Sequence, residues 1–492
     1  MARRMIETAL DALPYGPDEP DLSRVKKVPM PEGVSKRRLT RDVFMLSWPS
    51  LMELILSQLT SFVDQIMVGR IPGDMGVVGL AAVGLSMQPK FVMVTAMTAL
   101  NMGATAVIAR SRGQQNQERA NRVFHHAVLL NFILAVVLSV VGVWGSEWMI
   151  RFMGTNISET TIMAATEYLR IQFYGLVPMC MTFTITAALR GVGDTRTPLI
   201  YNTVANMVNL VGNYILIYGK LGMPALGVTG ASIATVFGQT VAFVIAFVFI
   251  LRRKSYLYFN FKEKFTFDRT ILSNMARVGI PAMVEQLLMR VGVLIYSRTV
   301  SSLGDVKYAT HQVLMSIQSF SWMLGQAFSA ASTTLVGQSL GKRRYDMAVI
   351  FLNRTRALAR WISLALALVI ILLRSPIVGL FTTDEAVIAM GAEIMFLIAL
   401  SLPFQTDTFV TSGGLRGAGD TRYSAMVTLI TVVIVRTILV TLMISVWNWG
   451  LWGAWISLMI DLLARTLLVH LRYRSGVWKG IKLKEAGENR IK

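Results

Sequence analysis

The sequence has few charged residues for a chain of 492. Asp, Glu, Lys and Arg make up 15% of it, against about 25% in soluble domains. Hydrophobic residues reach 54%, and the mean hydropathy is +0.54. A soluble protein of this composition would have to bury nearly all of its surface, whereas a membrane protein exposes apolar side chains to lipid. The composition therefore predicts a membrane protein.

Cysteine and histidine are also scarce. The single cysteine, Cys180, excludes an intramolecular disulfide and is predicted to be a small apolar side chain within a helix. None of the four histidines has a metal-ligand spacing, and the sequence lacks a nucleophile elbow and a phosphate-binding glycine loop. We therefore expect no enzyme, no cofactor, no resident metal and no ATP-hydrolysing module. Any pumping would draw on an ion gradient or a partner subunit.

Positive charge is in excess, with a formal net charge of +20. The basic residues form short clusters between apolar runs rather than one exposed face, which argues against nucleic-acid binding. Basic cytoplasmic loops of a membrane protein predict this pattern. Residues 1–41 are polar and basic, and we predict a mostly disordered cytoplasmic tail attracted to anionic lipid. Residues 476–492 are predicted to form a second cytoplasmic tail.

Apolar segments long enough to cross about 30 Å of hydrocarbon recur along the chain and predict about twelve transmembrane helices. The predicted spans are 43–68, 78–108, 120–144, 163–189, 197–218, 228–251, 271–300, 306–338, 347–373, 387–414, 423–446 and 451–473. Lys and Arg concentrate in the loops on one side. The positive-inside rule then places both termini in the cytoplasm, and the absence of organelle signals fits a bacterial inner membrane.

An internal repeat divides these helices into two groups of six. The sequence Leu189-Arg-Gly-Val-Gly-Asp-Thr-Arg196 matches Leu415-Arg-Gly-Ala-Gly-Asp-Thr-Arg422 at seven of eight positions, with an offset of 226. Residues 109–114 resemble 337–342, and 49–53 resemble 281–285, with offsets of 228 and 232. Six helices return the chain to the same side, so the halves are parallel repeats about a pseudo-two-fold axis along the membrane normal. We predict all-α bundles over 42–255 and 256–475.

The two repeated loops carry Arg190 and Asp194 in the first half, and Arg416 and Asp420 in the second. Their glycines permit a tight turn after a helix, and their opposite charges can pair locally. We interpret the loops as structural hinges; the alternative is that they contact substrate.

With these motifs the sequence resembles the multidrug and toxic compound extrusion (MATE) family of bacterial type. The resemblance is carried by the paired loops and by residues 63–69, 309–312 and 334–338, and it covers about residues 40–475. It implies an antiporter of two six-helix bundles. Members export cationic or amphipathic organic compounds against an inward flow of Na⁺ or H⁺.

Four acids at membrane depth are candidate cation-coupling residues, because such charges are costly there. The resemblance matches Asp64 to the family's helix-one coupling acid, which can exchange a proton or hold Na⁺ transiently. It matches Glu285 to a helix-seven acid, with a salt bridge to Arg290 or another bundle residue as the alternative. Glu53 lies about three turns before Asp64 and can share its cavity, or can be structural. Asp407 lies near an acid of sodium-coupled relatives.

The predicted span 197–218 carries asparagines at steps of four, three and four, which place them on one helix face. We predict a polar cavity network of these asparagines and one glutamine: Asn202, Asn206, Asn209, Asn213 and Gln312. The alternative is interhelical packing through amide hydrogen bonds. Some proton-coupled relatives have an acid where this chain has Asn213, which argues against a two-carboxylate proton relay.

The last two spans contain further charges. Asp461 and Arg465 are one helical turn apart and can pair, and Arg436 can pair with Asp461 or Asp407. We interpret these residues as mainly structural. Arg290 and Arg298 in the span 271–300 can serve the same purpose or repel cations.

The leading functional hypothesis is an ion-coupled, monomeric exporter of small organic compounds embedded in lipid. A flippase or exporter of a lipid-linked or metabolite substrate is the second hypothesis, although twelve helices and several buried acids argue against it. A receptor or scaffold without transport is the third.

Overall fold

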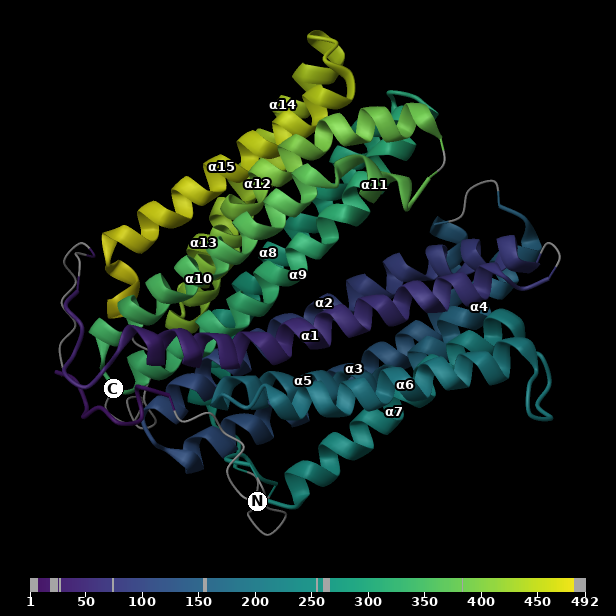
Figure 1. Cartoon of the computed structure of the whole chain (residues 1–492). Coiled ribbons are helices and arrows are strands. Elements are labelled where there is room, and N and C mark those ends of the chain that lie inside the picture. Colours follow the sequence, from purple (N-terminus) through teal and green to yellow (C-terminus); the bar gives the residue numbers. More distant parts are fainter. Residues whose placement is uncertain are drawn as a thin grey trace. The chain divides into compact units, whose positions relative to one another are not determined.

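The computed structural model describes residues 8–17, 25, 28–72, 75–153, 157–253, 255–259, 266–382 and 384–481. Within these ranges the protein is helical, with no β-strand (Figure 1). Every predicted span is present as a helix or as consecutive helical segments. The prediction of an all-α membrane protein of about twelve spans is confirmed.

The helices of the first half are longer than the predicted spans at several ends. They are α1 (Lys36–Gly69), α2 (Met75–Gly113), α3 (Gln117–Met153), α4 (Glu159–Tyr174), α5 (Leu176–Val192), α6 (Arg196–Tyr218) and α7 (Gly227–Leu251).

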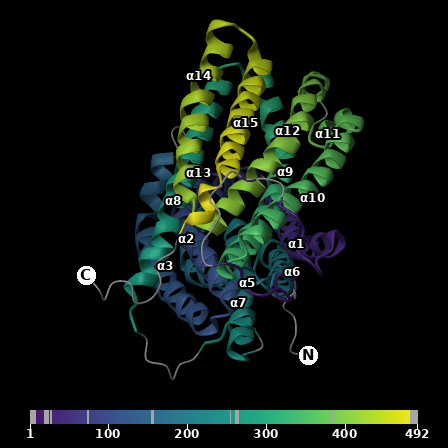
Figure 2. The same cartoon turned by 90° about the vertical axis from the view of Figure 1, so that its left-hand side faces the viewer.

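The second half repeats this order with one short additional helix. Its helices are α8 (Arg269–Ser301), α9 (Asp305–Gly341), α10 (Tyr345–Leu372), α11 (Arg374–Gly379), α12 (Glu385–Ala418), α13 (Thr421–Thr428), η1 (Leu429–Val435), α14 (Arg436–Thr441), η2 (Leu442–Val446), α15 (Gly450–Ser475) and η3 (Val477–Gly480). In Figures 1 and 2, α14 and α15 lie side by side, and contacts along both helices agree.

Nine helices of the described residues are long and apolar enough to cross a membrane by themselves, and α4 with α5 makes a tenth span. The helices α6 and α9 match the other two predicted spans but fall outside this set. Both carry rows of amide and hydroxyl side chains, which lower their hydropathy. Polar faces of this kind point to protein or water rather than lipid.

The predicted span 163–189 is bent by 50° between α4 and α5. Gly175 lies at the bend, where an added Cβ would fall 2.5 Å from a methyl group of Val236. Pro178, in the first turn of α5, has no N–H to continue the hydrogen bonds of α4. The bend therefore has a cause in the sequence, although the hydropathy pattern does not reveal it.

The predicted span 423–446 is helical throughout but contains two π-helical stretches, η1 and η2. A π-helical turn holds more residues than an α-turn and shifts the side chains that follow it. Arg436 comes directly after η1 and is buried. The stretch thus decides which face of this helix the arginine occupies.

The chain separates into two compact units. Among the described residues, the first unit contains Met52–Ile108 and Asn116–Ser273, and the second contains the earlier residues, Ala109–Gln115 and those from Asn274 onward. This differs from the predicted boundary at 255. The helix α1 has 34 residues, about 51 Å at 1.5 Å per residue, so it is long enough to pack its first part into the core of the second unit.

The N-terminal segment 8–17 belongs to the second unit, which differs from the predicted disordered tail over 1–41. Ala9 and Leu10 are buried in the apolar core of this unit. The backbone N–H of Ala9 donates to Oδ2 of Asp42 at 2.7 Å, and Nζ of Lys342 donates to the carbonyl of Leu10 at 2.9 Å. Buried apolar side chains and paired backbone groups explain why the segment is ordered. Residues 482–492 of the predicted second tail lie outside the described residues.

Two turns that are equivalent in the internal repeat pack against each other within the second unit. A Cβ on Gly113 would fall 1.9 Å from the carbonyl oxygen of Gln338, and a Cβ on Gly341 would fall 2.1 Å from that of Arg110. Arg110 and Gln338 are themselves equivalent, at the same offset of 228. Glycine at both positions allows the two backbones to touch.

Candidate functional site

In the first unit, polar side chains of α1 and α6 form a ladder. Asn202 donates to Oε1 of Glu53 at 2.8 Å, Asn206 to Ser57 at 3.5 Å, and Asn213 to Oδ1 of Asp64 at 2.5 Å. The sequence separation is 149 in all three pairs. A constant separation means that α1 and α6 run parallel in fixed register. The asparagine stripe therefore faces the acids of α1.

Asp64 lies at one end of this ladder and is half-buried. With its amide oriented to satisfy both polar atoms, Asn209 donates to both Asp64 oxygens at 3.2 Å. Within the described part of the chain, amides are the hydrogen-bond donors to this carboxylate, and no lysine or arginine forms an ion pair with it. Amides orient a carboxylate without neutralising its charge. Asp64 thus has no fixed positive counter-charge among the described residues.

Glu53 lies at the other end of the ladder in a different environment. Arg190 donates from Nη2 to its Oε2 at 2.8 Å, and Asn202 holds the second oxygen. The predicted hinge residue Arg190 therefore pairs with Glu53. Asp194 accepts from the backbone N–H of Thr197 at 3.1 Å and from its hydroxyl at 2.7 Å, at the start of α6. These contacts place Glu53 and Arg190 in an internal ion pair.

In the second unit, a cavity of about 260 Å³ lies among α8, α9, α12, α15 and the segment from α13 to α14. Its charged lining residues are Glu285, Arg290, Arg416, Arg436 and Arg465. Gln312, predicted as part of the polar network, also lines it and donates to the hydroxyl of Tyr308 at 2.7 Å. The cavity is therefore polar at several walls and carries more positive than negative charge.

Glu285 is the acid of this cavity. Its Oε2 is buried and accepts no hydrogen bond from the described residues. The guanidinium groups of Arg416 and Arg465 lie near enough to interact with its charge. The expected alternative, a salt bridge with Arg290, is not formed within the part of the chain that is described. Glu285 thus lines the cavity with one carboxylate oxygen that has no hydrogen-bond partner among the described residues.

Asp461 forms a buried ion cluster next to the cavity. Its Oδ2 accepts from Arg436, whose Nε lies at 2.9 Å, and from Nη2 of Arg465 at 2.8 Å. Both predicted pairings of Asp461 are confirmed, and Arg436 contacts Asp461 rather than Asp407. One carboxylate here serves two arginines, so the cluster keeps one positive charge.

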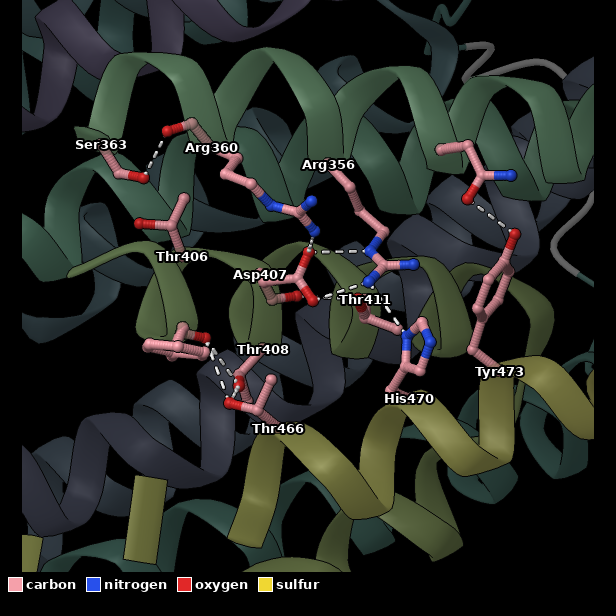
Figure 3. A network of polar contacts seen from close by, with 12 residues as sticks. Arg356, Arg360, Ser363, Thr406, Asp407, Thr408, Thr411, Thr466, His470 and Tyr473 are labelled. Atoms are coloured by element: carbon pink, nitrogen blue, oxygen red, sulfur yellow. Dashed lines mark hydrogen bonds and ion pairs between the residues drawn. The ribbon is translucent and has the colours of Figure 1, made fainter. Parts of the chain in front are cut away.

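Asp407 has two arginine partners from α10 (Figure 3). Arg356 donates to its two oxygens at 2.8 and 2.7 Å, and Arg360 donates to Oδ1 at 3.0 Å. His470 lies against Arg356 on the far side, at 3.0 Å. Asp407 is buried and does not line the cavity, although its neighbours Gln405 and Thr408 do. The charge of the Asp407 carboxylate is therefore already neutralised by the two arginines of α10.

The second repeated loop closes differently from the first. Gly419 ends α12 in the left-handed region at φ 91°, as Gly193 ends α5 at φ 92°. Asp420 pairs with Arg472 of α15 at 2.7 Å, whereas its equivalent Asp194 caps the next helix. The turn shape is thus repeated in both halves, and the two aspartates contact different elements, Asp420 the helix α15 and Asp194 the start of α6.

Several lining residues of the cavity were absent from the predicted site. They include Tyr296, His311, Trp322 and Phe409. The repeat offers a signal for one of them, because the offset of 232 aligns Tyr296 with Asp64. Arg356 and Arg360 were missed as partners of Asp407, since nothing in their local sequence indicates which helix they face.

Two repeated sets of membrane-spanning helices, one with an acid–amide ladder and one with a charged cavity, define a multi-pass membrane transporter. The MatE family model matches residues 49–215 and 281–442. The chain therefore belongs to the MatE family, which consists of transporters and not enzymes.

Individual relatives are similar over nearly the whole chain. The probable multidrug resistance protein NorM of Thermotoga maritima is 28% identical over 448 residues, covering 90% of this chain and 93% of the relative. The uncharacterized transporter YisQ of Bacillus subtilis is 24% identical over 439 residues, covering 89% and 95%. A MOP superfamily transporter of Pyrococcus furiosus, described as having a binding pocket of reverse polarity, has a TM-score of 0.83 at 23% identity, covering 92% and 100%. This last likeness shows the fold alone.

Proposed function

We propose that the chain is a secondary active antiporter that exports amphipathic organic compounds in exchange for Na⁺ or H⁺. It acts in a bacterial inner membrane with both termini in the cytoplasm. Membership of the family supports transport, and the name of the Thermotoga maritima relative supports multidrug cargo. No cofactor is needed, because the ion gradient supplies the energy.

The observation that carries the ion coupling is the environment of Asp64. Glu53, Asp407 and Asp461 each have an arginine partner, whereas Asp64 is held by the amides of Asn209 and Asn213. A half-buried carboxylate without a fixed counter-charge is stabilised when a cation or proton arrives. Ion binding at Asp64 is therefore a step that a gradient can drive.

Coupling requires that ion and cargo disfavour each other. If each binding event lowers the affinity for the other, the inward ion gradient drives the outward movement of cargo, and the linkage is reciprocal. Glu285 is the second candidate in this scheme, since its Oε2 accepts no hydrogen bond from the described chain. Glu53 and Asp407 act through their ion pairs as structural residues.

The test is ethidium transport by the purified protein in proteoliposomes, under an imposed Na⁺ gradient and then a proton gradient. We expect transport with one of the two gradients in the wild type and none in Asp64→Asn. Glu167→Gln, which removes an exposed acid of α4, is the matched control and should keep wild-type transport. Full gradient-driven transport by Asp64→Asn would refute the coupling role.

A lipid-linked or metabolite substrate is the second candidate function. The excess of arginine in the second unit's cavity favours it, because such substrates carry phosphate or carboxylate groups. Ethidium would then not move under either gradient, although the protein is folded in the membrane.

A further inference from the structure

The cavity of the second unit has an unusual charge balance for a protein expected to export cations. Four arginines and one glutamate line it, and Asp461 behind the wall neutralises one further charge. Two positive charges therefore remain in excess of the negative ones. In a low-dielectric site this excess attracts an anion and repels a cation strongly.

Several donors in the wall of this cavity have no hydrogen-bond acceptor among the described residues. They are Nε of Arg465, the hydroxyl of Tyr296, Nε1 of Trp322 and the hydroxyl of Ser424. A buried donor without a partner costs free energy, and most such groups in proteins have a partner. All four belong to residues that line one cavity, and its lining residues also include acceptors without a partner among the described residues, Oε2 of Glu285 and Oε1 of Gln318 and of Gln405. A ligand or water in the cavity can supply partners to such groups.

The geometry of Arg465 suits an oxyanion. Its Nη2 donates to Asp461 at 2.8 Å and its Nη1 to the sulfur of Met289 at 3.7 Å, which fixes the plane of the guanidinium, while Nε has no acceptor among the described residues. Arg290, on α8, lines the same cavity and is exposed at its surface. Arginine is the side chain best suited to carboxylate and phosphate groups, because its donors form a planar fork.

Aromatic side chains supply the apolar part of the wall. Tyr296, Trp322 and Phe409 line the cavity together with Met289 and Met315. Flexible thioethers and flat rings accept varied apolar shapes. The volume of about 260 Å³ is slightly below the roughly 300 Å³ of small-molecule pockets, so it has room for an acidic group and part of a ring system.

We propose that this cavity binds the oxyanion of an amphipathic organic molecule, a carboxylate, sulfonate or phosphate, through Arg290 and Arg465, with Tyr296 and Trp322 against its apolar part. This inference rests on the proposed transport function and adds molecules that carry an acidic group to its cargo. The oxyanion has two sources, a free organic anion and the headgroup of an anionic lipid.

The test is equilibrium binding of carboxyfluorescein, followed by fluorescence polarisation, to the full chain in phosphatidylcholine nanodiscs. We expect saturable binding by the wild type and at least a tenfold loss in Arg290→Gln and in Arg465→Gln. Arg298→Gln is the matched control, since Arg298 is an exposed arginine on the same helix but does not line the cavity. The affinity of this control for the dye should stay within about twofold of the wild type, because a residue outside the cavity shares no partner with the bound dye.

Arg465 also holds Asp461, so Arg290→Gln decides the outcome if Arg465→Gln fails to fold. Absence of saturable binding by the wild type would overturn the proposal, as would equal affinities of the wild type and Arg290→Gln. Ethidium measured in parallel should bind no more weakly to Arg290→Gln than to the wild type. A tenfold weaker ethidium affinity in this variant would show a non-selective effect and would also overturn it.

A second arm separates the two sources of the oxyanion. In nanodiscs containing phosphatidylglycerol, the lipid can compete with the dye and weaken its binding. If this competition occurs in the wild type and disappears in Arg290→Gln, it supports the site and makes a lipid headgroup its occupant. Unchanged dye affinity supports the site and makes a free organic anion its occupant. Because binding is measured without an ion gradient, it can succeed where gradient-driven transport fails, so the two proposals are tested separately.

Discussion

Arg190 donates to Glu53 at 2.8 Å, whereas Oε2 of the equivalent Glu285 accepts no hydrogen bond from the described chain, although Arg416 is near enough to act through its charge. The repeat thus places a glutamate and an arginine at equivalent positions in both units. In the first unit they form an ion pair, and in the second unit they line a cavity. This difference separates a structural pair from a ligand-binding one.

We expect Arg190→Gln to destabilise the protein, because it leaves the largely buried Glu53 carboxylate without its counter-charge. Breaking a buried pair costs about 3–5 kcal/mol. Thermal unfolding in detergent should show a clear fall in Tm. The double variant Arg190→Gln with Glu53→Gln should lose less than the two single losses added together. Additive losses would mean that the two residues do not act as a pair.

Asp407→Asn should act on stability rather than on ion coupling. The change leaves Arg356 and Arg360 without the carboxylate that both contact, so we expect a lower Tm. Ethidium transport per folded molecule, measured in proteoliposomes at equal protein content, should keep its dependence on the ion gradient. Loss of that dependence would return Asp407 to the coupling residues.

Gly113→Val should disrupt the contact between the two equivalent turns. Even a Cβ would lie 1.9 Å from the carbonyl oxygen of Gln338, so the backbones must move apart, and overpacking of this kind costs about 1–3 kcal/mol. Gly84→Ala on the same helix meets nothing within 4 Å and serves as control. A Tm of Gly113→Val equal to that of Gly84→Ala would contradict the contact.

Removal of residues 1–17 should lower stability, because Ala9 and Leu10 contribute to the core of the second unit. The truncation also removes the carbonyl of Leu10 that accepts from Lys342. We expect a lower Tm in detergent, and restoration when the chain is truncated only before residue 8. A truncated protein as stable as the full chain would show that the segment is not needed for the fold.

Lys342 predicts a specific pH dependence. Burial lowers its pKa below that of an exposed lysine, so the unfolded chain binds this proton more tightly than the folded one. Stability from this group therefore rises with pH between the two pKa values. As the pH rises toward the ordinary lysine pKa of about 10.4, the free energy of unfolding should increase more steeply in the wild type than in Lys342→Met. Parallel pH curves would contradict this effect.

The sequence predicts the helices of this fold well because lipid imposes a simple rule, a long apolar segment for each crossing. The repeat around Arg190 and Arg416 then gives the division into halves. The bend at Gly175 escapes prediction, since it depends on the contact with Val236. The N-terminal segment also escapes, because its composition is that of a tail and its order depends on a buried lysine far along the chain.

The candidate site, like the fold, could be predicted from the sequence only in part. A stripe of asparagines at helical spacing indicates that α6 presents one polar face, and that face does meet Asp64 and Glu53. The partners of Asp407 and Asp461 come from other helices, so no local pattern identifies them. Residue spacing also cannot reveal that Glu53 is in an ion pair while Oε2 of Glu285 accepts no hydrogen bond from the described chain, because this depends on side-chain packing around each acid.

The open state of Glu285 and the closed state of Glu53 illustrate what duplication offers a transporter. When a half is copied, every stabilising pair exists twice, and one copy can hold its part of the fold in place. The equivalent pair in the other copy is then not needed for stability, so the residues around it can be substituted to bind a different cargo. In this chain the first half holds Arg190 and Glu53 together as a structural ion pair. In the second half the equivalent glutamate, Glu285, lines a cavity with one oxygen unpaired.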